Sequence, residues 1–143
     1  MQQTIKNIAH ILERELKIYR ELLGISKNIT DVILNGEIKK LDELLKLQQT
    51  IIMTLGKLEN DRLKAMDGLW KEDLVMTEII ERAQEDIAKK LTQLLDDLLE
   101  VIDEQNRVNE INEKLIRTEL EYVEFALGTM ASKGPINIFD EKA

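Results

Sequence analysis

The sequence predicts an all-α fold, a long antiparallel helical bundle or coiled coil built from a helical hairpin and a long third helix. Apolar residues recur at steps of three, four or seven along most of the chain, which is the spacing of helices that pack along one side. The chain is 43% hydrophobic and 34% charged with one proline, a composition typical of long helices. Only 3% of its residues are aromatic, so β-strands have little support.

The first helix is expected over about residues 2–34. Asn35-Gly36 follows it directly, and this pair readily adopts the left-handed conformation that ends helices. The apolar stripe of this helix consists of Ile5, Ile8, Leu12, Tyr19, Leu22, Ile29 and Ile33.

The second helix is expected over about residues 37–67, with Asp67-Gly68 as its end. Because only two residues separate the first two helices, they must form an antiparallel hairpin. The segment "DGLWKEDLVMT" lacks a clean period and is expected to be a loop. The stripe of the second helix consists of Ile38, Leu41, Leu45, Ile52, Leu55, Leu58 and Met66.

The third helix is expected over about residues 78–130, continuous or bent between 105 and 112, with Thr77 as its N-cap. Gly134-Pro135 should stop it, because proline removes a hydrogen-bond donor and clashes with the preceding turn. We therefore expect one helical domain over residues 1–131 and a flexible tail over residues 132–143.

The third helix is longer than its partners. At about 1.5 Å per residue it should span roughly 80 Å, against roughly 45 Å for the second helix. The third helix runs antiparallel to the second and passes the end of the hairpin near residue 108. The predicted bundle seam or hinge of this region consists of Gln105, Asn109, Asn112, Ile116, Leu120, Val123 and Leu127. Asn109 and Asn112 have three possible roles: a polar layer that specifies register, a hinge at the boundary, or direct contact with a partner.

A second apolar stripe lies about 110° around the third helix from the seam. Only Glu119 interrupts the surface between the two stripes. A helix that packs on one neighbour needs one stripe, so the extra face must be covered by a fold-back, by another copy of the chain or by a partner helix. The candidate partner-binding residues on this face are Val108, Ile111, Leu115, Tyr122, Phe125 and Ala126.

Two segments carry a family resemblance. "NRVNEINEKLIRTELEYVEFALGTM", residues 106–130, resembles the signature of the FlgN family of flagellar type III export chaperones, in which asparagines precede a Leu-rich helix that ends in an aromatic and aliphatic run. "NITDVILNGEIKKLDELLKLQQTIIMTLGKLENDRLKAM", residues 28–66, is similar to the family's first hairpin, including a closing Glu59-x-x-Arg62.

The resemblance implies a cytoplasmic chaperone that binds hook-associated flagellar proteins, prevents their premature assembly and delivers them to the export gate. Family members hold the amphipathic C-terminal helix of the cargo on their C-terminal half, here residues 108–130, and have no enzymatic activity. Many members place a Tyr that contacts the gate four residues before a tail Gly. Met130 stands there before Gly134, and Tyr122, Phe125 or Phe139 could take that role.

Several other classes of function are disfavoured. A net charge of −8 argues against nucleic acid as a partner, and no apolar run approaches the length of a membrane span. Without cysteine there is neither a disulfide framework nor a thiolate metal site, and a reducing cytoplasm is the default. We find no catalytic, metal or cofactor motif. The alternatives are a homodimeric coiled-coil scaffold and a helical regulator of an unrelated protein.

Overall fold

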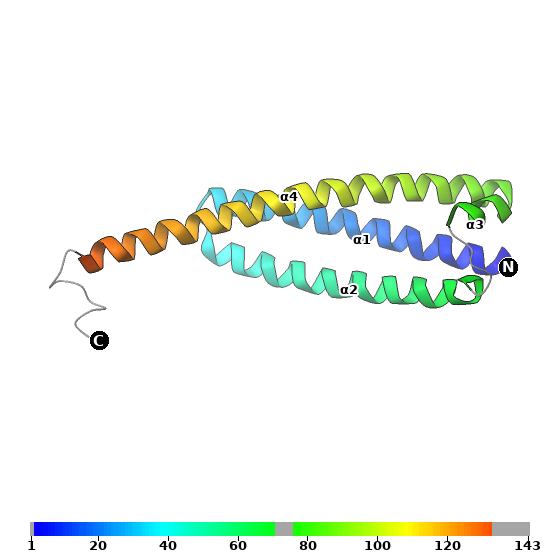
Figure 1. Ribbon diagram of the computed structural model, residues 1–143, viewed down its shortest axis with the longest axis horizontal. Coiled ribbons are helices and arrows are strands. Elements are labelled where there is room, and N and C mark those ends of the chain that lie inside the picture. The colour runs from blue at the N-terminus through cyan, green and yellow to red at the C-terminus, as the bar shows by residue number, and fades with distance from the viewer. Residues whose placement is uncertain (1, 71–75, 133–143) are drawn as a thin grey trace.

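A computed structural model of the chain describes residues 2–70 and 76–132, and within these ranges the regular structure is helical throughout. The helices are α1 (Gln2–Leu34), α2 (Ile38–Trp70), α3 (Met76–Arg82) and α4 (Glu85–Ser132). Figure 1 shows α1 and α2 as an antiparallel hairpin, with α3 at the end near the N-terminus and α4 running back along α1 and past the hairpin. The predicted all-α bundle is confirmed.

The central helix is α1, which packs against both α2 and α4. Along the described residues α2 and α4 make at most marginal contact with each other. This explains why Ile38, Leu45 and Ile52 are exposed, although the spacing of the sequence placed them on the packed stripe of the second helix. The fourth helix lies over α1 and leaves the first half of α2 partly uncovered.

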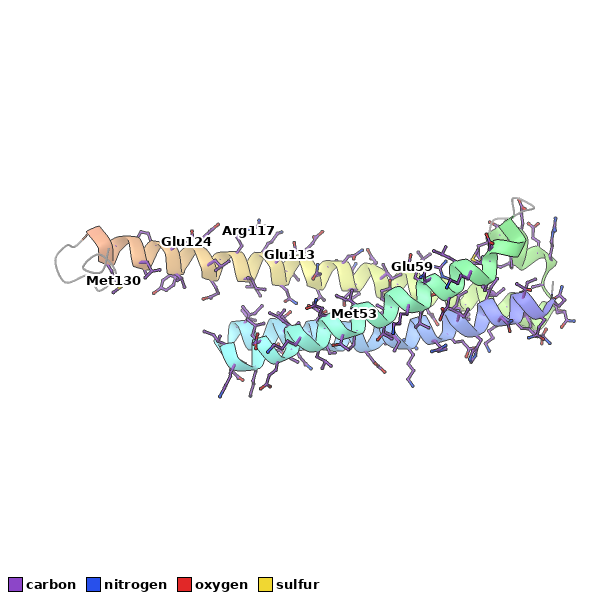
Figure 2. The ribbon with its side chains drawn as sticks, turned by 90° about the horizontal axis from the view of Figure 1, so that it is seen from below. Met53, Glu59, Glu113, Arg117, Glu124 and Met130 are labelled. Carbon is purple, nitrogen blue, oxygen red and sulfur yellow. The ribbon has the colours of Figure 1, made fainter. Side chains whose placement is uncertain are left out.

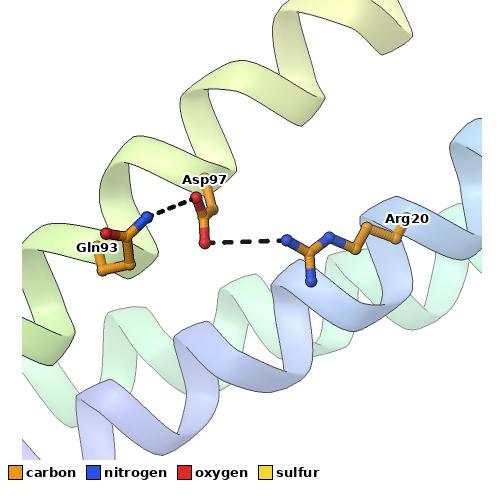
Figure 3. Close-up of polar contacts among 3 residues, drawn as sticks. All are labelled: Arg20, Gln93 and Asp97. Atoms are coloured by element: carbon orange, nitrogen blue, oxygen red, sulfur yellow. Dashed lines mark hydrogen bonds and ion pairs between the residues drawn. The ribbon is translucent and has the colours of Figure 1, made fainter.

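Ion pairs between α1 and α4 show that these two helices run parallel. Three pairs follow one another at steps of seven residues on both helices: Glu13–Lys90, Arg20–Asp97 and Lys27–Glu104. In Figure 3 the carboxylate of Asp97 lies between the guanidinium of Arg20, at 3.8 Å, and the amide of Gln93, which donates to it at 2.9 Å. Such partly exposed pairs add little stability, so their main effect is to favour one register.

The hydrophobic core lies at the end of the bundle that holds the N-terminus. Met66 from α2 and Ile79 from α3 close this end, and Ile79 is almost completely buried. The other residues of this cluster come from α1 and α4: Ile5, Ile8, Ala9, Leu12, Leu16, Leu91, Leu94, Leu98 and Val101. Further buried apolar residues, Leu22, Ile29 and Ile33 of α1 and Leu55 and Leu58 of α2, lie outside the cluster. The apolar contacts that stabilise the fold are therefore concentrated far from the free end of α4.

The first helix ends as predicted at Asn35-Gly36. Gly36 has a φ of 69°, a left-handed conformation that costs glycine little and side-chain-bearing residues more. Two backbone bonds close the turn, from the Gly36 amide to the Ile33 carbonyl at 3.1 Å and from the Glu37 amide to the Val32 carbonyl at 3.0 Å. This pair of bonds is the Schellman arrangement, and it satisfies carbonyls that the helix end would otherwise leave free.

The predicted end of the second helix at Asp67-Gly68 is wrong, because α2 continues to Trp70. A single glycine costs a helix only about 1 kcal/mol. Met66, just before Gly68, is buried in the core and holds this part of α2 against α1. Of the expected loop over residues 67–77, residues 71–75 lie outside the described residues, and the rest belongs to α2 and α3.

The prediction of one third helix is also wrong at its start, because α3 and α4 are separate helices with a break at Ala83-Gln84. Thr77 lies inside α3 instead of capping it. The side chain of Gln2 holds the break: its amide donates to the Arg82 carbonyl at 2.8 Å, and its oxygen accepts the Gln84 amide at 3.3 Å. The residue types around Ala83-Gln84 do not by themselves interrupt a helix, so the break depends on contact with α1.

From Glu85 onward α4 is continuous to Ser132, including residues 105–112 where a bend was an alternative. Its first turn carries Glu85 and Asp86, which interact favourably with the positive end of the helix dipole. Beyond Ser132, the predicted tail lies outside the described residues.

A buried ion pair joins α1 to α2. Arg62 donates from Nε to Oε1 of Glu15 at 2.9 Å, and their side chains are only 23% and 8% exposed. Burial raises the pKa of Glu15 above its ordinary value of 4.5, while the charge of Arg62 and its hydrogen bond act in the opposite direction. The carboxylate of Glu15 therefore depends on Arg62 to remain charged inside the bundle.

We expect Arg62→Met to lower the free energy of unfolding by about 2 kcal/mol at pH 7.5, because it leaves a buried carboxylate unpaired. Without Arg62 the folded-state pKa of Glu15 rises further. Because the folded-state pKa of Glu15 is raised, the stability that this group contributes is fully present below about pH 4.5. That contribution is lost as the pH rises through the folded-state pKa of Glu15. The loss should therefore be smaller at pH 5 than at pH 7.5 when measured by urea unfolding.

The matched control is Arg107→Met, because Arg107 pairs with Asp103 on the exposed surface of α4. It should change stability by less than about 0.5 kcal/mol at either pH. Equal, pH-independent losses in both variants would contradict the role assigned to Glu15 and Arg62.

Candidate partner-binding groove

A polar layer interrupts the apolar contacts midway along the bundle. Its centre is Ser26 of α1, which is fully buried. The Ser26 hydroxyl accepts the side-chain amides of Gln48 from α2, at 3.1 Å, and of Gln105 from α4, at 2.9 Å. Its backbone carbonyl accepts the side-chain amide of Asn112 at 2.9 Å. One serine of α1 thus binds both α2 and α4.

The hydrogen bonds of the layer fix its geometry, but not every polar atom in it has a hydrogen-bond partner. Thr30 donates its hydroxyl to the amide oxygen of Asn112. By contrast, the amide oxygen of Gln105 is buried and has no hydrogen-bond partner among the described residues. An incompletely satisfied buried layer costs stability relative to apolar contacts, and its best-attested benefit is that only one register satisfies its remaining bonds.

The structure separates the amide residues that the sequence had placed together on the seam. Gln105 and Asn112 are buried in the layer, whereas Asn109 is exposed and donates to Glu113 of its own helix at 3.3 Å. Asn109 is therefore not a seam residue. Sequence reasoning missed Ser26, Thr30 and Gln48, although a small or polar residue within an apolar stripe was an available signal.

Beyond Asn112 a groove of about 270 Å³ opens between α4 and the tip of the hairpin. Its lining is apolar except for Glu37 and Glu119. The hairpin contributes Val32, Ile33, Gly36, Glu37, Ile38 and Leu41, and α4 contributes Ile116, Glu119, Leu120 and Val123. In Figure 2 the labelled Glu124 and Met130 lie past the hairpin tip, which marks where α4 continues alone.

We call residues 113–132 of α4 the overhang. The predicted seam stripe continues along it, but only Ile116 is half-buried, while Leu120 is 57% exposed and Val123 and Leu127 are also exposed. The helix runs for roughly 24 Å beyond Ile116. Within the described residues no segment folds back over it, so the seam stripe is largely uncovered beyond Ile116.

The second stripe is also largely uncovered. Val108, Leu115 and Ala126 are half-buried and Ile111 is exposed. Tyr122 and Phe125 are 69% and 72% exposed, whereas aromatic side chains are usually more buried than this. Apolar surface therefore occupies both sides of the overhang, and the seam side forms a wall of the groove.

Two further kinds of site are absent from the part of the chain that the structure describes. Across residues 2–70 and 76–132, no group of three or more acidic, His or Cys side chains could hold a metal ion. No helix in these same ranges is long and apolar enough to cross a membrane. The fold and its groove define an α-helical bundle with an open apolar surface.

Comparison with known proteins agrees with this class. The family model described as "FlgN protein" matches residues 1–135. The chain therefore belongs to the FlgN family, a family of flagellar export chaperones. A relative from Bacillus subtilis (strain 168), named uncharacterized protein YvyG, is 25% identical over 130 residues, which cover 90% of this chain and 81% of YvyG. No solved structure matches the chain significantly.

The polar layer allows a comparison of two substitutions. Asn112→Ala removes the donor to the Ser26 carbonyl and the acceptor of Thr30, so it should destabilise the protein by about 2 kcal/mol. Gln105→Met removes one hydrogen bond but also the buried unpartnered oxygen, so it should change stability by less than about 1 kcal/mol. Chemical unfolding of both variants tests this order, and a larger loss for Gln105→Met would contradict it.

Proposed function

We propose that this chain is a cytoplasmic export chaperone that binds hook-associated flagellar proteins, prevents their premature assembly and delivers them to the flagellar type III export gate. The observation that supports the proposal most is an open apolar groove between the hairpin tip and the overhang in a member of the FlgN family. The chain acts by binding and has no catalytic role in this proposal.

The shape of the groove suits a helix as its occupant. One wall is the hairpin tip, with Ile33, Ile38 and Leu41, and the other is the seam stripe of the overhang. An amphipathic helix laid between them would bury Leu120 and Val123 and continue the bundle where α1 ends. At about 1.5 Å per residue, a helix of roughly 16 residues matches the part of the overhang beyond Ile116. The C-terminal helix of a hook-associated protein is the proposed occupant.

The second stripe extends the same contact surface. On a helical projection Leu115 and Ala126 lie about 40° or less from Glu119, which lines the groove. A cargo that covers the groove and continues around the overhang would therefore also contact Tyr122 and Phe125. We include all six second-stripe residues, from Val108 to Ala126, in the proposed cargo surface.

Gate docking is proposed for the end of α4. Met130 stands where many family members carry Tyr, and it is exposed near the end of the overhang. Tyr122 and Phe125 are exposed aromatic residues on the same segment, whereas Phe139 lies outside the described residues. Each can be tested by substitution in a gate-binding assay.

The groove is tested by Leu120→Asp. This substitution should weaken binding of a hook-associated protein by on the order of 2 kcal/mol, because it places an unpaired carboxylate at the centre of the contact. Helicity and melting temperature should change little, since Leu120 is 57% exposed in the free chain. Calorimetric titration and circular dichroism measure the two effects. Tyr122→Asp, tested in the same way, reports on the second stripe.

The matched control is Leu99→Asp, an exposed leucine on the same helix but outside the overhang. It should leave the affinity unchanged. If Leu120→Asp and Tyr122→Asp both bind at the affinity of the original chain, the cargo surface lies elsewhere. A stable dimer, seen by light scattering, that ignores added hook-associated protein would instead support the homodimeric scaffold.

A further inference from the structure

We propose that the partner helix carries a Lys or Arg within its otherwise apolar face, and that Glu119 binds this cation. The inference rests on the proposed function, because it names the class of helix that the groove selects. Glu119 is the one charged residue that α4 contributes to the groove lining.

The position of Glu119 on α4 is surrounded by apolar side chains. Its neighbours three and four residues away on the helix are Leu115, Ile116, Tyr122 and Val123. At about 100° per residue, Glu119 lies between the two stripes, about 60° from the seam stripe and about 50° from the second stripe. A helix seated across the overhang would therefore cover this carboxylate together with the apolar residues around it.

No cation within residues 2–70 and 76–132 neutralises Glu119. It makes no ion pair or hydrogen bond with any residue that the structure describes, and the groove lining contains no Lys or Arg. The bases of the overhang, Lys114 and Arg117, lie about 140° and 160° around the helix from it. Lys40, on the hairpin, is bound to Glu37 at 2.6 Å.

This arrangement discriminates among amphipathic helices. A wholly apolar face would remove Glu119 from water without a partner, which disfavours binding. A Lys or Arg at the matching position would form a charge-assisted bond with the carboxylate, and its methylene stem would pack against Leu120 and Val123. Glu119 thus rejects simple apolar helices and favours those with one embedded cation.

The experiment measures the affinity of hook-associated proteins from the same bacterium for three variants of Glu119. We expect Glu119→Gln to weaken binding about tenfold and Glu119→Lys about a hundredfold, and Glu119→Leu to bind more weakly than the original chain. Replacing the partner's embedded Lys or Arg with Glu should restore binding to Glu119→Lys. The matched control is Glu121→Gln, because Glu121 lies about 160° around the helix from Glu119 and should not affect affinity.

Two results would overturn the inference. One is a Glu119→Leu variant that binds as well as or better than the original chain while Leu120→Asp abolishes binding; the groove would then stand as the cargo site without the charge selection. The other is failure of every charge swap in the partner to restore binding to Glu119→Lys. If no hook-associated protein binds the original chain, the proposed function fails before the variants are compared.

Discussion

The parallel alignment of α1 and α4 is the constraint on which the rest of the structure depends. Both helices begin at the closed end of the bundle, but α1 has 33 residues and α4 has 48. The Schellman turn at Gly36 ends α1 and sends the chain back along it, so nothing of the hairpin continues beside the last part of α4. The groove and the overhang are direct consequences of this difference in length.

Stability and binding are separated along the molecule. Apolar burial is concentrated around Ile8, Ile79 and Leu91 at the closed end, and the Glu15–Arg62 pair joins the hairpin near it. The Ser26 layer follows, and it favours one axial and rotational position of α4 because its hydrogen bonds require that position. That rotation directs Ile116 and Val123 into the groove with Glu119 beside them. The free end can therefore present apolar surface without weakening the core.

Much of the candidate site could be predicted from the sequence, for a simple geometric reason. Helix lengths and the 3.6-residue period are local properties, so the surplus length after residue 112 and its two apolar stripes can be read directly. Which stripe meets the hairpin tip is a property of packing. The structure shows that the groove is lined by Ile116, Leu120 and Val123 from the seam stripe, whereas Tyr122 and Phe125 remain on the outer side.

The sequence by itself determined the helical class, the hairpin at Asn35-Gly36 and an overhanging helix with unpaired apolar surface, because periodicity and glycine conformation act within a few residues. Only the tertiary structure decided the break at Ala83-Gln84, the continuation of α2 to Trp70 and the membership of the polar layer. The break depends on Gln2, about eighty residues away in the chain, and Asn109 is excluded from the layer by the rotation of α4 against α1. Such outcomes depend on contacts between distant segments, which local propensity does not encode.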